Sequence, residues 1–322
     1  MNIIFFGSDN FAVPSLRALI ANGYSIFCVV TQPDRERGRG LSLAATAIKL
    51  AAQELGLKIY QPNEINSAQT LKFLKALNPD LFVVIAYGQL LSREILDIPR
   101  IISINIHASL LPKYRGAAPI NWAIINGETA TGVTAIKMAS KMDAGPIIQQ
   151  KDTGINKDDT SVTLEDKLSK VAAGLLIDSL KSIENNSYKL TPQDENRASF
   201  APKLKKENGL ILWSKPAQEI YNLIRGCLGW PDAFTYYKGK LLKIYKARVS
   251  SQVPACRQAG RKFASSNLGE ILEASREGIV VFAGKGNIII EELQIEGKRR
   301  MRVEEFIAGH KILPGEILRA KK

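Results

Sequence analysis

The stretch SINIHASLLPKYRGAAP (residues 103–119) joins a predicted strand to a proline turn and a basic loop marked by glycine. The apolar run IISINI that leads into it is typical of a strand buried in a sheet. Successive side chains of a strand point to opposite faces, so Asn105 and His107 share one face. The sequence therefore places an amide and an imidazole together at the end of a buried strand.

The same kind of strand recurs through the first half of the chain, with a helical pattern after most of them. Strands are predicted over 2–6, 24–30, 57–60, 81–86 and 101–106, and helices over 10–21, 44–55, 67–77 and 92–96. Apolar strands that alternate with helices are typical of an α/β fold, here a Rossmann-like, mostly parallel sheet covered on both faces. Ligands of such sheets bind beyond the carboxyl ends of the strands, where Asn105 and His107 lie.

The second half of the chain has a different character. An amphipathic helix over 161–184 closes the first domain, and the polar, proline-containing segment 190–208 is expected to be a linker. A helix then precedes short strands with hairpin turns between them, over 233–249, 268–275, 278–284 and 287–295. Such strands are typical of a small β-barrel. We therefore expect a catalytic α/β domain over 1–189 and an OB-like barrel over 209–322.

Composition excludes several classes of protein. The chain has 322 residues, of which 45% are hydrophobic and 23% charged, as in ordinary globular proteins. The first residues lead straight into a strand and do not resemble a signal peptide, and the most apolar run, 81–91, is too short to span a bilayer. Three cysteines, odd in number and far apart, predict neither a disulfide framework nor a zinc site. A reducing cytoplasm is the expected compartment.

The charge is unevenly distributed along the chain. From Lys203 to the end there are 23 Lys and Arg against 12 Asp and Glu, whereas the first 202 residues have 21 against 19. A basic second part favours a polyanionic partner that docks on the C-terminal region. The alternative is a basic surface that keeps the protein soluble, and the charge by itself leaves both interpretations open.

The strand end carries two side chains that can take part in catalysis. Asn105 can donate to a developing oxyanion and His107 can take a proton, which is the minimum for an acyl-type transfer. An imidazole that acts as a base needs an acidic partner, and Asp143, in a turn after the next strand pattern, is the candidate. Alone, His107 would be interpreted as a core histidine and Asp143 as a turn residue. Only the combination favours a catalytic site.

The combination resembles a known family. The block NIHASLLPKYRGAAPINWAIINGE, followed about 35 residues later by KMDAGPI, is similar to the folate-dependent formyltransferases. Within that group the chain resembles the branch that acts on methionyl-tRNA, through IIFFGSDNFAVPSLRAL, TQPDRERGRG, VVIAYGQLL, IRGCLGWPDAFTYY and the terminal PGEIL. The first block specifies the reaction, whereas the 31–40 loop and the C-terminal domain point to the tRNA.

The resemblance implies a reaction and roles for individual residues. The amino group of initiator methionyl-tRNA would attack the formyl carbon of 10-formyltetrahydrofolate and form a tetrahedral intermediate. Asn105 would hydrogen-bond its oxyanion, and His107, supported by Asp143, would accept or relay the amine proton. No metal is implied, because the leaving group is an activated amide nitrogen. A cytoplasmic monomer is expected.

Binding residues are carried over in the same way. The turn that matches the folate contact consists of Ser109, Leu110, Leu111 and Pro112. The residues expected to contact the tRNA are Arg37 and Arg39 in the charged loop, and Lys298, Arg299 and Arg300 in the C-terminal region. The chain departs from the family pattern at Leu41, Ser42 and Leu212, and the polar segment 250–267 is an insertion to which no chemistry is assigned.

Three other interpretations each fit part of the sequence. Another folate enzyme could pass the formyl group to water, to a purine precursor or to an amino sugar. The basic β domain argues against the purine-precursor enzyme, which is shorter and lacks one, and the 31–40 loop argues against the amino-sugar enzyme. A nicotinamide-dependent dehydrogenase would need three glycines where GSDNFAV has one. A non-enzymatic RNA-binding module would leave Asn105, His107 and Asp143 unexplained.

Overall fold

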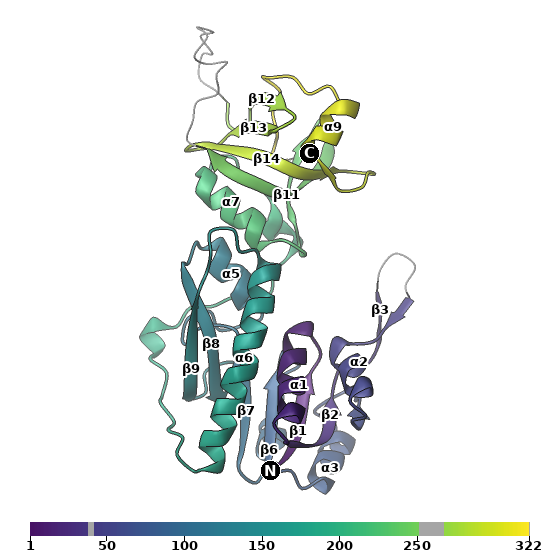
Figure 1. Cartoon of the computed structure of the whole chain (residues 1–322), viewed down its shortest axis with the longest axis vertical. Coiled ribbons are helices and arrows are strands. Elements are labelled where there is room, and N and C mark those ends of the chain that lie inside the picture. Colours follow the sequence, from purple (N-terminus) through teal and green to yellow (C-terminus); the bar gives the residue numbers. More distant parts are fainter. Residues whose placement is uncertain (38–41, 251–266, 322) are drawn as a thin grey trace. The chain divides into compact units, whose positions relative to one another are not determined.

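The computed structural model describes residues 1–37, 42–250 and 267–321 (Figure 1). These residues form two compact units. The first consists of Met1–Pro119, Ala130–Ile155 and Thr163–Pro202, and the second of Ile120–Thr129, Asn156–Val162 and the C-terminal part from Lys203. None of the helices in the described ranges combines the length and the apolar character needed to cross a bilayer.

The first unit is built on a seven-stranded sheet in the order β5-β2-β1-β6-β7-β8-β9. Its strands are β1 (Asn2–Gly7), β2 (Ser25–Val30), β5 (Ile59–Tyr60), β6 (Leu81–Ile85), β7 (Ile102–His107), β8 (Ala130–Lys137) and β9 (Ile147–Gly154). The pairs from β5 through to β7 are parallel, and β8 and β9 are added antiparallel at one edge. The expected mostly parallel sheet is confirmed.

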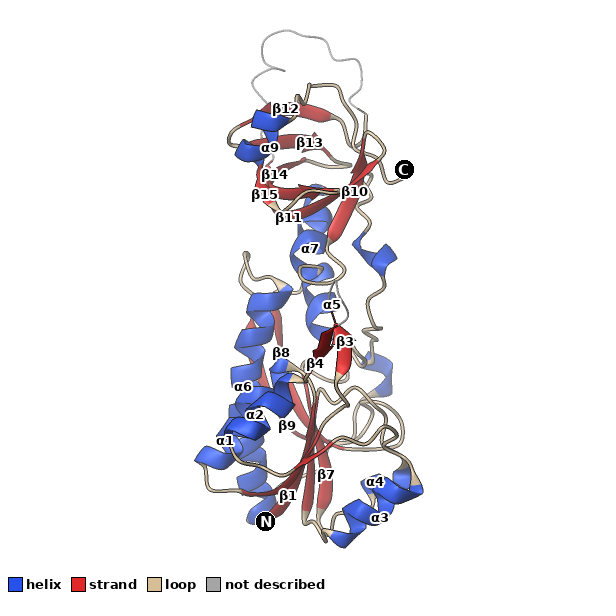
Figure 2. Ribbon diagram, turned by 90° about the vertical axis from the view of Figure 1, so that its right-hand side faces the viewer, coloured by secondary structure: helices blue, strands red, loops and turns tan. Residues whose placement is uncertain are grey.

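Helices cover both faces of this sheet, because the central strands β1 and β6 are apolar on both sides. The helices are α1 (Val13–Ala21), α2 (Ala47–Glu54), α3 (Ala68–Ala76), α4 (Arg93–Leu96) and α6 (Ser161–Glu184). Figure 2 shows α1 and α2 on one face and α3 and α4 on the other. Alternate residues of one strand serve the two layers: Ile4 and Phe6 pack with Leu74 of α3, and the intervening Phe5 is fully buried as well.

The second unit is an antiparallel sheet in the order β10-β11-β14-β13-β12, with β15 (Met301–Arg302) paired to β14. Its strands are β10 (Ala233–Tyr237), β11 (Lys240–Ser250), β12 (Ile271–Ser275), β13 (Gly278–Phe282) and β14 (Asn287–Ile295). The C-terminal segment bridges both edges, since Arg319 pairs with Tyr236 of β10 and Ile317 pairs with Glu270 just before β12. This segment closes the sheet on itself, as expected for a small barrel.

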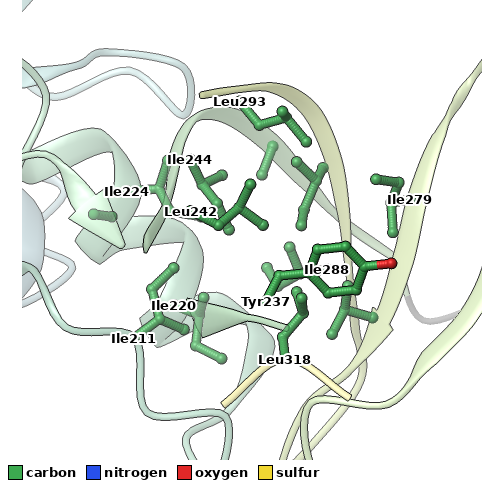
Figure 3. Packing of buried hydrophobic residues seen from close by; sticks show 14 of the residues in the cluster. Ile211, Ile220, Ile224, Tyr237, Leu242, Ile244, Ile279, Ile288, Leu293 and Leu318 are labelled. Atoms are coloured by element: carbon green, nitrogen blue, oxygen red, sulfur yellow. The ribbon is translucent and has the colours of Figure 1, made fainter. Parts of the chain in front are cut away.

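The core of the second unit is mostly aliphatic, with Trp213, Tyr237 and Phe306 as its buried aromatic residues. Side chains from α7 (Ala217–Gly226), β11, β13 and β14 converge in its interior, as Figure 3 shows for Ile220, Leu242, Ile279 and Ile288. Leu318 from the closing segment belongs to the same core. The C-terminal segment is therefore part of the barrel's packing as well as of its hydrogen bonding.

Several local features differ from the sequence predictions. The 31–40 stretch, expected as a loop, begins an antiparallel pair of β3 (Arg35–Arg37) with β4 (Ser42–Ala44). The short helices α5 (Pro119–Ile125) and α9 (Val303–Gly309) were not predicted, because seven-residue helices carry too few turns for a clear apolar period. Most of the predicted insertion 250–267 lies outside the described residues.

The segment 190–208, expected as a linker, is held to the first unit over much of its length. Ser199 accepts from the backbone of Arg115 through its carbonyl at 2.8 Å, and Ala201 donates back to Arg115 at 2.7 Å. Thr191 exchanges backbone hydrogen bonds with Ile147 at the start of β9. This segment therefore contributes hydrogen bonds to the loop that follows β7.

Candidate active site

Asn105 and His107 lie at the carboxyl end of β7, in the middle of the first sheet. Val84 of β6 pairs with Asn105 on one side, and Thr134 of β8 pairs with His107 on the other. His107 is only 7% exposed, whereas Asn105 is half-buried. The strand therefore presents the amide toward solvent and holds the imidazole in a largely protein environment.

The imidazole of His107 has one neighbour at each nitrogen. Nε2 lies 2.9 Å from the carbonyl oxygen of Tyr114, and Nδ1 lies 3.6 Å from Oδ2 of Asp143. A carbonyl can only accept, so Nε2 carries the proton and donates it to Tyr114. In the neutral ring Nδ1 is then the basic nitrogen, and it faces a carboxylate that would stabilise the ring once it became charged.

Asp143 lies in the turn between β8 and β9, with a side chain that is 12% exposed. One carboxylate oxygen, Oδ2, accepts from the backbone N–H of Gly116 at 2.9 Å, and the other, Oδ1, accepts from Nδ2 of Asn105 at 3.5 Å. Its backbone has a positive φ of 51°. The structure thus brings together the three residues that the sequence proposed as catalytic.

A buried arginine fixes the Asp143 turn, and the sequence did not reveal it. Arg115, 1% exposed, donates to Oε1 of Gln193 through Nε and Nη2 at 3.0 and 2.8 Å, and to both oxygens of Glu195. The Gln193 amide nitrogen in turn donates to the carbonyls of Asp143 and Gly145 at 2.8 and 2.7 Å. The guanidinium of Arg115, and then Lys141, lower the pKa of Glu195 to about 2. This chain of contacts positions Asp143 from behind.

Gly145 permits the close return of this turn. A β-carbon at position 145 would lie 1.8 Å from the carbonyl oxygen of Lys137, which no other residue could tolerate without moving the backbone. The glycine in the sequence KMDAGPI therefore serves the geometry of the turn that carries Asp143.

The turn at residues 109–112 is held by hydrogen bonds from below. Ser109, fully buried, donates to the carbonyl of Lys113 at 2.6 Å. Thr134 donates to the carbonyl of Ser109 at 2.6 Å and accepts from the N–H of Leu111 at 3.1 Å. Because Ser109 and Leu111 are buried, only Leu110 and Pro112, which are half-buried, can offer side-chain surface to a ligand without a change in the turn.

A second loop, at residues 86–88, follows β6 at the same edge of the sheet. The carbonyl of Tyr87 accepts from Ser8 Oγ at 3.1 Å and from Gln32 Nε2 at 2.7 Å. The carbonyl of Ala86 accepts from the N–H of Ser8 at 3.2 Å. This loop follows β6, which pairs with β7 at Asn105, and the 109–112 turn is bonded to Thr134 of β8, which pairs with His107.

The residues predicted to contact tRNA are distributed differently. Arg37 ends β3, and Arg39 lies outside the described residues. The base of that hairpin is fixed by Asp34, whose carboxylate accepts from Lys49 at 2.5 Å and from Gln61 at 2.9 Å. The hydrogen bond from Lys49 is the main cause of the lowered pKa of Asp34.

In the C-terminal cluster, two of the three predicted cations are paired within the protein. Arg299 forms an ion pair with Glu305, and Arg300 donates through Nε to Glu292 at 2.9 Å. The Arg300 guanidinium also lies over the ring of Tyr245, 4.5 Å from its centroid. Lys298 is exposed on the loop after β14. Sequence proximity alone therefore does not make these three cations equivalent.

Within the described ranges, no three His, Cys, Asp or Glu side chains gather so as to hold a metal ion. The chemistry available at the end of β7 is an amide N–H donor, a basic imidazole nitrogen and a carboxylate that supports it. These groups are suited to the transfer of an acyl-type group to a nucleophile that must lose a proton.

Comparison with known proteins agrees with this geometry. Residues 1–180 match the family model described as formyl transferase, and residues 203–311 match that of the formyl transferase C-terminal domain. The first match covers the α/β part of the chain, and the second covers the β part.

Curated relatives are similar over their full length. A methionyl-tRNA formyltransferase of Moorella thermoacetica is 45% identical over 318 residues, covering 99% of each chain. One of Citrifermentans bemidjiense is 42% identical over 321 residues, covering 100% of this chain and 97% of the relative. Among solved structures, the sugar 3N-formyl transferase WlaRD, studied in the presence of dTDP and 5-N-formyl-THF, shares the fold, with a TM-score of 0.65 at 23% identity. That likeness covers 93% of this chain and 99% of WlaRD.

Proposed function

Because this chain belongs to the methionyl-tRNA formyltransferase family, we propose that it transfers the formyl group of 10-formyltetrahydrofolate to the amino group of initiator methionyl-tRNA. The observation that carries the proposal is the convergence of Asn105, His107 and Asp143 at the end of β7. The product is N-formylmethionyl-tRNA, which serves translation initiation.

The reaction makes two demands on the protein. A bond forms between the amine nitrogen and the formyl carbon, and the bond from that carbon to the folate nitrogen breaks. The amine loses one proton, the folate nitrogen gains one, and the formyl oxygen carries negative charge between the two steps. The site must therefore donate a hydrogen bond to this oxygen and move a proton.

Asn105 meets the first demand. An amide nitrogen carries two hydrogens, so one N–H remains for the formyl oxygen even while the other is directed at Asp143. A donor that is already oriented costs no reorganisation as charge develops, and loss of one such donor typically slows turnover by roughly 100- to 1,000-fold. The 3.5 Å contact to Asp143 keeps the amide at the end of the strand.

His107 meets the second demand through Nδ1. Since Nε2–H is committed to the Tyr114 carbonyl, Nδ1 accepts the amine proton, and Asp143 at 3.6 Å stabilises the imidazolium that results. The same proton can then be returned to the departing folate nitrogen. The buried position of His107 strengthens this interaction, because the pair is poorly screened by water.

The turn at 109–112 and the loop at 86–88 are the parts that would hold the folate. Leu110 and Pro112 give apolar contact surface, and the hydrogen bonds of Thr134 and Ser8 keep both loops in place. When bound, the folate supplies an activated formyl carbon. Arg37, the last residue of β3, and Arg39, which lies outside the described residues, are proposed to contact the acceptor end of the tRNA. The basic region from Lys203 onward is proposed to bind its phosphates.

The test is a comparison of acceptors with one donor. Labelled 10-formyltetrahydrofolate is incubated with the protein and, in turn, initiator Met-tRNA, elongator Met-tRNA, a nucleotide-linked amino sugar, or water alone. We expect rapid transfer to initiator Met-tRNA and at most slow transfer to the others. Transfer to the amino sugar, or release of formate at a comparable rate, would refute the proposed acceptor in favour of another formyltransferase or a hydrolase.

A further inference from the structure

The second unit contains a cavity that the proposed reaction does not use. It has a volume of about 450 Å³ and lies where the β10–β11 turn meets the C-terminal segment. Its lining residues are Tyr236, Tyr237, Lys238, Gly239, Gly315, Glu316, Ile317, Arg319 and Lys321. Its size is that of a site for one small molecule or one unit of a polymer.

The aromatic wall of this cavity is held in place on two sides. Tyr236 and Arg319 exchange backbone hydrogen bonds of 2.8 and 2.9 Å, so they are directly opposite in an antiparallel pair and their side chains share one face. The ring of Phe234 meets the ring of Tyr236 edge-on, with 6.1 Å between centroids. A half-buried tyrosine ring with an arginine beside it thus faces the cavity.

The charges around the cavity favour an anion. Glu316 is the one acidic residue in the lining, and its carboxylate already accepts from Tyr237 Oη at 2.5 Å, from Lys238 at 2.6 Å and from the N–H of Leu313 at 3.1 Å. Arg319 and Lys321 are exposed, and no ion pair joins either of them to a carboxylate in the residues that the structure describes. Two cations therefore remain for a ligand.

We propose that this cavity binds one nucleotide of a single-stranded segment of RNA, with the base against Tyr236 and the phosphate between Arg319 and Lys321. Aromatic rings and arginine planes stack on unpaired bases, whereas a duplex keeps its bases out of reach of such a ring. The inference rests on the proposed function, since the acceptor there is an RNA. It adds a site on the β domain, separate from the chemistry at Asn105 and His107.

The test measures binding of a labelled 12-nucleotide single-stranded RNA and of a duplex of the same length to the full chain. Tyr236→Ala should weaken binding of the single strand roughly tenfold or more, because alanine removes the stacking surface. Tyr236→Phe, which keeps the ring, should bind within about twofold of wild type on the same reasoning. Tyr236→Leu replaces the alanine variant if the latter fails to fold, and the same loss is expected.

Charge is tested with a matched pair of variants in the same domain. Arg319→Glu should weaken single-strand binding and reduce its salt dependence, while Arg276→Glu, at the exposed β12–β13 turn, should change both much less. Equal losses for the two variants would reduce the effect to net charge and overturn the site. An equal loss of duplex binding in Tyr236→Ala would overturn the stacking assignment.

Two further measurements are made. One distinguishes a free nucleotide from RNA as the ligand, and the other tests the proposed reaction independently of the cavity. If 5′-AMP binds as tightly as the 12-mer and competes for Tyr236, the ligand is a free nucleotide and the RNA assignment is wrong. Formylation of Met-tRNA by the wild-type protein is measured in parallel. Its absence would refute the proposed reaction while leaving the oligonucleotide result to decide the cavity.

Discussion

At the scale of single residues, the tautomer of His107 is decided by a backbone group and not by another side chain. The backbone carbonyl of Tyr114 commits Nε2 to donation, which leaves Nδ1 as the base beside Asp143. The sequence predicted Asn105, His107 and Asp143, because strand alternation and a motif place them. It could not predict the tautomer, because any residue at position 114 supplies a carbonyl and only the path of the chain brings it to the ring.

Asp143→Asn removes the charge of the carboxylate. The amide oxygen can still accept from the Gly116 N–H, so the turn should keep its shape. The imidazolium loses its counter-charge, and Asn105 loses the carboxylate oxygen that accepts from its amide. We expect kcat to fall by roughly 100-fold, the scale of a lost general base, with little change in KM for either substrate. Steady-state kinetics against both substrates provides the measurement, and an unchanged kcat would remove Asp143 from the proton transfer.

At the scale of elements, the sequence predicted the helices and strands that have a recognisable hydrophobic pattern. Strand β6 is a continuous apolar run, β7 alternates isoleucines with polar side chains, and α6 is long enough to show an amphipathic repeat. The Arg115 cluster was not predictable in this way, because its contacts join residues 78 and 80 positions apart in a segment that resembles a linker. A polar, proline-containing composition is found both in free linkers and in segments that are hydrogen-bonded to a domain, so composition does not distinguish the two for residues 190–208.

The hydrogen bonds of segment 190–208 predict that replacing Gln193 lowers both stability and turnover. Gln193→Ala removes two acceptor contacts from Arg115 and two donor contacts to the Asp143 turn, leaving buried groups without partners. The free energy of unfolding should fall by about 1–3 kcal/mol, and kcat should fall as well. Arg197→Ala, an exposed neighbour on the same segment, is the control and should stay close to wild type in urea unfolding. A Gln193 variant as stable and active as the control would contradict this role of segment 190–208.

The start of α6 carries a pH-dependent contact. Burial, and then the adjacent Asp9, raise the pKa of Glu165 from 4.5 to about 7. The folded protein therefore keeps this proton after the unfolded chain has lost it, so stability falls as the pH rises from 4.5 to 7. Glu165→Gln should unfold at a higher temperature than wild type at pH 8, with the difference vanishing below pH 4.5. Asp166→Asn, exposed on the same turn, is the control, and a pH-independent difference for Glu165→Gln would argue against this pKa.

At the scale of the whole molecule, net charge and available charge are different quantities. The basic balance from Lys203 onward was evident in the sequence, but many of these cations are paired to nearby acids, as Lys243 is to Asp232 and Arg248 to Glu291. Such pairings depend on which strands are neighbours, which composition does not reveal. Positions without an internal carboxylate partner are the better candidates for phosphate contacts.

The cluster after β14 makes this distinction testable. Lys298→Ala should reduce the slope of log affinity for tRNA against log salt by up to about 0.7–0.9, the value for one phosphate contact. Arg300→Ala should change the slope much less, because its guanidinium is held by Glu292 and the Tyr245 ring. Filter binding at several salt concentrations measures both. A larger effect for Arg300→Ala would mean that the ion pair opens to the RNA.

The central claim is that Asn105 and His107 perform the transfer of a formyl group to methionyl-tRNA. Single-turnover transfer of labelled formyl from 10-formyltetrahydrofolate, with saturating protein and initiator Met-tRNA, reports this chemistry directly. We predict that Asn105→Ala and His107→Ala each lower the rate constant by roughly 100-fold or more while the thermal unfolding curve and tRNA affinity stay close to wild type. A rate constant equal to wild type in either folded variant would contradict the account.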